Sequence, residues 1–76
     1  MKTYRRVHLE SKRTIIEEVT EEFSDWSIKV MTEENGRTPG VVLLSASTLE
    51  DAEQSADAVV RKDHSCDDLC GNWTRV

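Results

Sequence analysis

The residues best suited to metal chemistry stand close together near the end of the chain. His64, Cys66 and Cys70 fall within seven residues, with two aspartates between the cysteines. Structural zinc needs four ligands and favours cysteines two residues apart. Here three residues separate the cysteines, and a fourth ligand would have to come from His8 or an aspartate. We therefore predict free thiols, no metal and no cofactor. A disulfide between Cys66 and Cys70 fits a turn of helix but is disfavoured in a reducing compartment.

Residues for catalysis are sparse. Enzymes need a nucleophile beside a base, paired carboxylates in a cleft or an open metal position. His8 and His64 are the two histidines of the chain, and neither a Gly-rich phosphate loop nor an elbow-like serine setting is present. A chain of 76 residues buries only about 60% of its unfolded surface, which leaves little material for a wide cleft. We predict that the protein is not an enzyme.

Charge is divided unevenly along the chain. Residues 1–13 carry five bases and one acid, a balance of +4, whereas residues 14–34 carry seven acids and one base, a balance of −6. The net charge of −5 disfavours direct nucleic-acid binding, which depends on Lys and Arg neutralising phosphates. A concentrated negative field attracts and orients a basic protein partner. We expect the acids of the second segment to bind such a partner: Glu17, Glu18, Glu21, Glu22, Asp25, Glu33 and Glu34.

The first half of the chain predicts a strand and then a helix. Residues 3–9 alternate in polarity and are rich in strand-forming residues. From Thr14 onward, apolar residues recur at spacings of three and four, and Thr14 with Glu17 matches a capping box, so we predict a helix over residues 12–24. Read as a strand, this segment would put acids among the apolar side chains of one face. The opposing signal is a run of β-branched residues, which lose side-chain freedom in helices.

The middle of the chain predicts a hairpin. Residues 26–31 alternate in polarity as a half-buried strand does, and Asn35-Gly36 and Pro39-Gly40 are turn dipeptides. Residues 41–44, with the sequence VVLL, form a short continuous apolar run, which is typical of a central strand buried on both faces.

The second half predicts a helix over residues 48–62. Ser47 and Glu50 match a capping box. The apolar residues that follow form one stripe: Leu49, Ala52, Ala56, Val59 and Val60. Residues 63–76 are a tail or an edge strand, with residues 64–71 a turn or short helical piece and residues 72–76 the last strand.

The order strand, helix, strand, strand, helix, strand is that of the ferredoxin-like βαββαβ motif. We predict a single α+β domain over residues 1–76, with a small antiparallel sheet and two helices on one face. The alternative is a β-sheet with a single helix in the C-terminal half. No apolar run follows the basic start, so we expect neither a signal peptide nor a membrane span, and we expect a cytoplasmic protein.

In length, acidic balance, compact α+β order and lack of a catalytic motif, the chain resembles the small phage-encoded inhibitors, including anti-CRISPR proteins, that block a host complex by occupying its nucleic-acid path. The resemblance implies a non-enzymatic protein-binding module, an inhibitor that docks its acidic face on a basic, nucleic-acid-binding surface in the host cytoplasm. The alternatives are a small bacterial regulatory or accessory protein, and a nucleic-acid-binding module that uses the basic N-terminal strand. A homodimer is a further option for the assembly.

Overall fold

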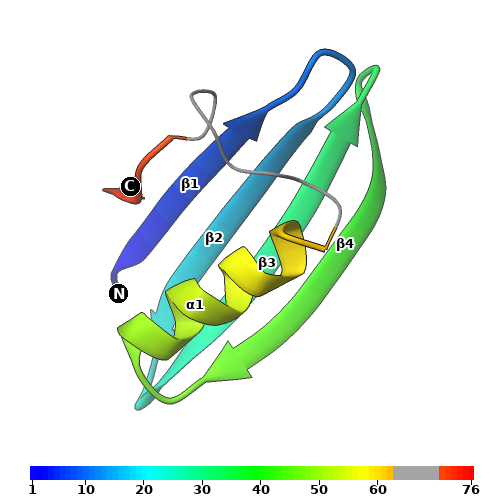
Figure 1. Ribbon diagram of the computed structural model, residues 1–76. Coiled ribbons are helices and arrows are strands. Elements are labelled where there is room, and N and C mark those ends of the chain that lie inside the picture. The colour runs from blue at the N-terminus through cyan, green and yellow to red at the C-terminus, as the bar shows by residue number, and fades with distance from the viewer. Residues whose placement is uncertain (63–70) are drawn as a thin grey trace.

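A five-stranded antiparallel sheet forms the body of the protein. The computed structural model describes residues 1–62 and 71–76. Four strands follow one another along the chain and in space: β1 (Thr3–Leu9), β2 (Thr14–Glu22), β3 (Asp25–Glu34) and β4 (Arg37–Ala46). The helix α1 (Leu49–Val60) comes next, and the short β5 (Thr74–Arg75) pairs with β1, so that the strand order is β4-β3-β2-β1-β5 (Figure 1).

The helix α1 lies across one face of the sheet and contacts β2, β3 and β4 (Figure 1). Opposite residues of antiparallel neighbours share a face, so the register aligns Tyr4, Val19, Ile28 and Leu44 in one row beneath the helix. The alanines of α1 leave room for the helix to approach this surface closely. The buried apolar core consists of Ile15, Val19, Ile28, Val30, Ala52, Ala56 and Val60.

The predicted second helix is confirmed, with small changes at its ends. Its N-cap is Thr48, whose Oγ1 accepts a hydrogen bond of 3.1 Å from the backbone N–H of Asp51. The capping position is therefore one residue later than the predicted Ser47. The apolar stripe faces the sheet, with Leu49 and Val59 partly buried at the edges of the core.

The predicted first helix is wrong, and with it the two-helix ferredoxin-like order. Residues 14–22 form strand β2, paired with β1 on one side and β3 on the other. Over the described residues the fold is therefore a mostly β-sheet domain with one helix, as in the alternative prediction. The β-branched run suits an extended central strand. The acid that counted against a strand, Glu17, is buried beside a histidine of β1 instead of facing solvent.

The position of β4 also differs from the prediction. The hairpin of β3 and β4 forms, but β4 lies at the edge of the sheet, and Val41, Val42, Leu43 and Leu44 are all exposed. A continuous apolar run is typical of a strand covered on both faces, whereas here each of the four residues keeps at least 40% of its surface exposed, although α1 contacts β4. Pro39-Gly40 lies inside β4 and not in a turn. Asn35-Gly36 makes the turn, and both residues have positive φ, 53° and 75°.

The predicted last strand is confirmed in a shorter form. Beside β5, the backbone N–H of Gly71 donates to the carbonyl of Val7 at 2.9 Å, and that of Val76 donates to Thr3 at 2.8 Å. Trp73 packs against the core near its edge. The predicted thiols and His64 lie outside the described residues. In the described part of the chain, no helix is long and apolar enough to cross a membrane.

Candidate functional site

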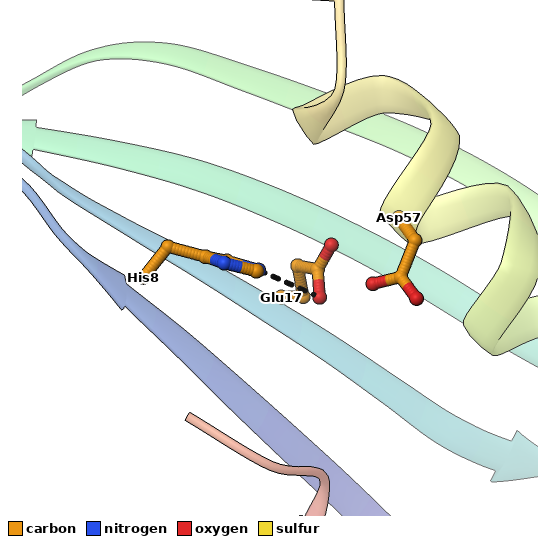
Figure 2. A group of neighbouring side chains, drawn as sticks. All are labelled: His8, Glu17 and Asp57. Carbon is orange, nitrogen blue, oxygen red and sulfur yellow. Dashed lines mark ion pairs between the residues drawn. The ribbon is translucent and has the colours of Figure 1, made fainter. Parts of the chain in front are cut away.

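A group of charged side chains lies between the sheet and the helix. His8 of β1 and Glu17 of β2 are fully buried, and His8 Nε2 lies 3.2 Å from Glu17 Oε2 (Figure 2). Asp57 of α1 points toward the same place, and one ligand atom from each of the three residues lies within 4.8 Å of the others. We call these three residues, together with Arg6, the polar centre.

Arg6 completes the polar centre from β1. Its Nη1 lies 3.0 Å from Asp57 Oδ1, and its Nε donates to the carbonyl of Gly71 at 2.8 Å. Glu53, one helical turn before Asp57, has its pKa raised by partial burial and next by the negative charge of Asp57, while Arg6 acts in the opposite direction. The centre thus joins β1, β2, α1 and the C-terminal segment.

The alternation of the strands brings these side chains together. Arg6 lies directly opposite Glu17, and His8 lies opposite Ile15, on the sheet face that α1 covers. A helix over residues 12–24 leaves Glu17 among exposed acids, so that prediction misses the centre. The sequence could have indicated the polar centre through the alternative interpretation of residues 14–22 as a strand, in which Glu17 lies between Ile15 and Val19 on one face. A carboxylate there requires a cationic or hydrogen-bonding partner.

Histidine and carboxylates at this spacing are chemically able to ligate a divalent cation. The guanidinium of Arg6 competes for one of these ligands, because it already holds the Asp57 carboxylate at 3.0 Å. A buried carboxylate that faces a histidine and a neighbouring arginine is explained by charge compensation alone. We therefore interpret the polar centre as an ion-pair group that ties the helix to the sheet.

The seven predicted partner-binding acids do not form one face. Glu17 is buried in the polar centre, and Glu18 points to the opposite face of the sheet, where its Oε2 lies 2.6 Å from Arg5 Nη2. Glu21, Glu22 and Asp25 gather at the turn between β2 and β3, with Glu22 directly opposite Asp25. The last two acids, Glu33 and Glu34, lie at the other end of β3.

The turn between β2 and β3 carries an exposed aromatic residue. Phe23 is fully exposed and has a φ of 54°, in the left-handed region that a bulky residue rarely adopts. We call Phe23 with its neighbours Glu21, Glu22 and Asp25 the acidic tip. An exposed ring in a turn flanked by acids is a feature that an interface with a basic partner would use.

The basic N-terminal segment is largely neutralised by ion pairs. Arg5 pairs with Glu18 and Arg6 pairs with Asp57. Arg13 pairs with Glu10 across the turn between β1 and β2, at 2.7 Å. Because these guanidinium groups are already engaged with carboxylates, β1 is poorly suited to hold phosphates.

The outer side of β4, which we call the open edge, is the most distinctive surface of the described chain. The exposed fraction of residues 41–44 ranges from 40% to 71%, with Leu43 the most exposed. Among the described residues no strand lies beyond β4, which pairs only with β3. An edge strand presents unpaired backbone N–H and C=O groups to solvent and readily accepts another strand.

The sheet face away from α1 carries a second apolar row. Val7, Ile16, Met31 and Val41 are aligned across four strands by the register. The first three are partly buried, and Val41 ends the row at the open edge. The edge strand is therefore apolar on both of its faces, because Val42 and Leu44 lie on the helix side.

A hollow of about 170 Å³ lies on the helix side, next to β4. Gly40 has no side chain to fill it, and a Cβ built at Gly40 meets nothing within 4 Å. The lining side chains are apolar except for Thr32, and the lining comprises Ile15, Val30, Thr32, Gly40, Val42, Val59 and Val60. This hollow offers a contact surface for an apolar side chain.

Comparison with protein-family models, with curated proteins and with solved structures finds no match to this chain. The resemblance to small phage-encoded inhibitors gains no support from these comparisons, and the element order on which it partly rested is corrected by the fold.

Proposed function

We propose that the protein is a non-enzymatic protein-binding module that takes up an extended segment of a protein partner along the open edge. The observation that carries this proposal is the exposure of four consecutive apolar residues, 41–44, on an edge strand of ten residues. Natural edge strands are normally short, charged, bulged or covered, because an uncovered one invites pairing with other chains. An added strand would gain backbone hydrogen bonds from β4 and specificity from alternate side chains.

The charges at the ends of the open edge favour a partner with a basic residue at one end. Glu33 and Glu34 lie beside the start of β4, and Glu50 and Asp51 follow its end in the first turn of α1. The apolar run of β4 lies between these two pairs of acids. Arg37 stands opposite Glu34 and offsets its charge at the start of β4, so an apolar segment with Lys or Arg at the end beside Glu50 and Asp51 would match these features.

A second mode of binding uses the acidic tip. A bulky residue in the left-handed region costs conformational energy, and Phe23 gains no burial in return. Placed in a pocket of a partner, the same ring would act as an anchor, and its three acidic neighbours would favour a basic rim. This mode keeps the predicted docking of acidic side chains on a basic surface. The basic surface could be that of a nucleic-acid-binding protein, which the docked module would inhibit.

One experiment separates the two surfaces. The wild-type protein, Leu43→Lys and Phe23→Lys are each used to capture partners from a lysate of the source cell, and captured proteins are quantified by mass spectrometry. Each variant replaces an exposed apolar side chain by lysine, so each serves as the control for the other. We expect Leu43→Lys to lose partners that Phe23→Lys retains. Equal capture by all three proteins would contradict binding through either surface.

Loss with Phe23→Lys alone would transfer the function to the acidic tip. In that case the double variant Glu18→Lys/Glu22→Lys provides a further check of the tip, which contains Glu22. Glu18 lies outside the tip, in an ion pair on the sheet face. Binding that depends on the acids should also weaken with added salt.

A further inference from the structure

We propose that the strand added at the open edge is β4 of a second copy of this chain, so that two sheets join into one continuous sheet around a twofold axis. This inference rests on the proposed function and names the partner at the same surface. Isologous pairing of this kind uses the same patch on both copies. The two edges of the sheet, the composition of β4 and the hollow beside Gly40 support it.

The two edges of the sheet differ in how far their backbone groups are paired. At the β1 edge, the C-terminal segment contributes β5 and two further backbone hydrogen bonds, from Gly71 to Val7 and from Val76 to Thr3. At the β4 edge, the features that normally discourage pairing are confined to one end. Arg37 and Pro39 stand among the first three residues, and residues 40–46 contain neither a charge nor a proline. The pairing surface is thus open at the apolar part of β4.

A partner strand must be apolar on both faces to match β4. Val41 and Leu43 face away from α1, whereas Val42 and Leu44 face the helix side. Within the described chain, β4 is the strand that combines four consecutive apolar residues with an unpaired edge. Directly opposite residues in an antiparallel pair share a face, so β4 paired with itself sets apolar side chains against apolar side chains on both faces.

The hollow selects the register. With Val42 on the twofold axis, Gly40 of one copy lies opposite Leu44 of the other. The missing side chain at Gly40 leaves the apolar hollow of about 170 Å³ beside it, and Val42 forms part of the lining. Leu44 of the second copy would enter this space, and the symmetry would repeat the contact. The row of Val7, Ile16, Met31 and Val41 would continue into its counterpart on the other face.

The charges near β4 are compatible with this arrangement. Antiparallel pairing brings Arg37, the one charged residue of β4, to the end of the second copy's β4 that leads into α1. The first turn of that helix carries Glu50 and Asp51. The attraction is local, whereas the net charge of −5 on each copy opposes association at longer range.

The assembly is tested by sedimentation equilibrium on the full chain over a range of protein concentrations. We expect a concentration-dependent rise from 8.7 kDa toward twice that mass. Leu43→Lys should weaken the dimer by about tenfold or more, and Phe23→Lys, in the turn between β2 and β3, should leave it unchanged. A mass of 8.7 kDa at every concentration overturns the dimer. The proposed function would survive that result if Leu43→Lys still lost partners in the capture experiment.

The register is tested by a charge exchange on the axis. Val42→Lys sets two like charges opposite each other in the dimer, and Val42→Glu does the same with the opposite sign, so each variant alone should be monomeric. An equimolar mixture should recover the dimer. Melting curves show whether each variant is folded. Failure of the mixture to associate, with both variants folded, overturns the pairing at Val42.

Salt distinguishes a second copy from a basic partner. Two acidic chains repel each other less when their charges are screened, so the dimer should become tighter between about 10 mM and about 150 mM salt. A complex with a basic protein should weaken over the same range. A homodimer that dissociates as salt increases would contradict an apolar contact at the open edge.

Discussion

His8 Nε2 and Glu17 Oε2 lie 3.2 Å apart in side chains that are both fully buried between the sheet and the helix. Buried pairs of this kind contribute little against an apolar replacement of equal volume, but removing one member is costly because the other polar side chain is left in the core without it. We expect Glu17→Leu or His8→Leu to destabilise the protein by about 3–5 kcal/mol each.

The double variant His8→Leu/Glu17→Leu should cost less than the sum of the two single variants, as urea denaturation would measure. Glu18→Gln, in the exposed pair with Arg5, is the control and should cost about 1 kcal/mol or less. Strictly additive losses at His8 and Glu17 would show that the two side chains do not act as a pair.

The orientation of α1 is tested at two neighbouring alanines. Ala56 is fully buried, and Ala58 is exposed. We expect Ala56→Asp to lower the free energy of unfolding by about 3–4 kcal/mol, because it buries a carboxylate among apolar groups. Ala58→Asp should cost about 1 kcal/mol or less. Similar costs at both alanines would contradict the position of the helix face.

Glu53 makes the stability of the fold dependent on pH. Its pKa in the folded protein is raised above the ordinary 4.5, chiefly by partial burial and then by Asp57. The folded state therefore holds this proton more tightly than the unfolded state, and protonation of Glu53 adds stability as the pH falls through the raised pKa toward 4.5. Glu53→Gln should stabilise the protein at neutral pH and lose this advantage below the ordinary pKa.

Thermal melts of Glu53→Gln and wild type between neutral and acid pH measure this difference. Glu34→Gln, exposed at the end of β3, is the matched control. A gain from Glu53→Gln that stays constant with pH would point to a cause other than the charge.

Phe23 should be replaceable with a gain in stability. Its φ of 54° is accepted more readily by asparagine than by a bulky side chain, and its ring is fully exposed. We expect Phe23→Asn to raise the free energy of unfolding by about 0.5–1 kcal/mol. The companion measurement is Phe23→Leu, which keeps a bulky side chain and should bring no gain. Loss of stability in the asparagine variant would indicate that the ring is packed.

The C-terminal segment should be required for full stability. Deleting residues 72–76 removes Trp73 from the edge of the core, together with β5 and the hydrogen bond from Val76 to Thr3. We expect a clear fall in the melting temperature. Trp73→Ala should reproduce a substantial part of the fall, because the ring supplies the apolar burial of this segment. An unchanged melting temperature after the deletion would mean that the segment does not pack.

The elements with unambiguous local patterns were predictable from the sequence. Alternation identified the strand over residues 3–9, the turn at Asn35-Gly36 identified the hairpin, and the apolar stripe from Leu49 to Val60 identified the helix and the face it buries. For the strand and the helix, one local periodicity, of two or of about 3.6 residues, matched the structure that formed.

Tertiary structure decided the rest, because the deciding contacts join residues far apart in the chain. Residues 14–22 carry both a helical spacing and a β-branched run, and pairing with β1 and β3 selects the strand. Glu17 can occupy a buried strand position only because β1 brings His8 and Arg6 beside it. The sequence by itself determined that residues 41–44 are apolar and extended. Their place at the edge depended on which strands the chain had available to pair with β4, and among the described residues β3 is its one neighbour.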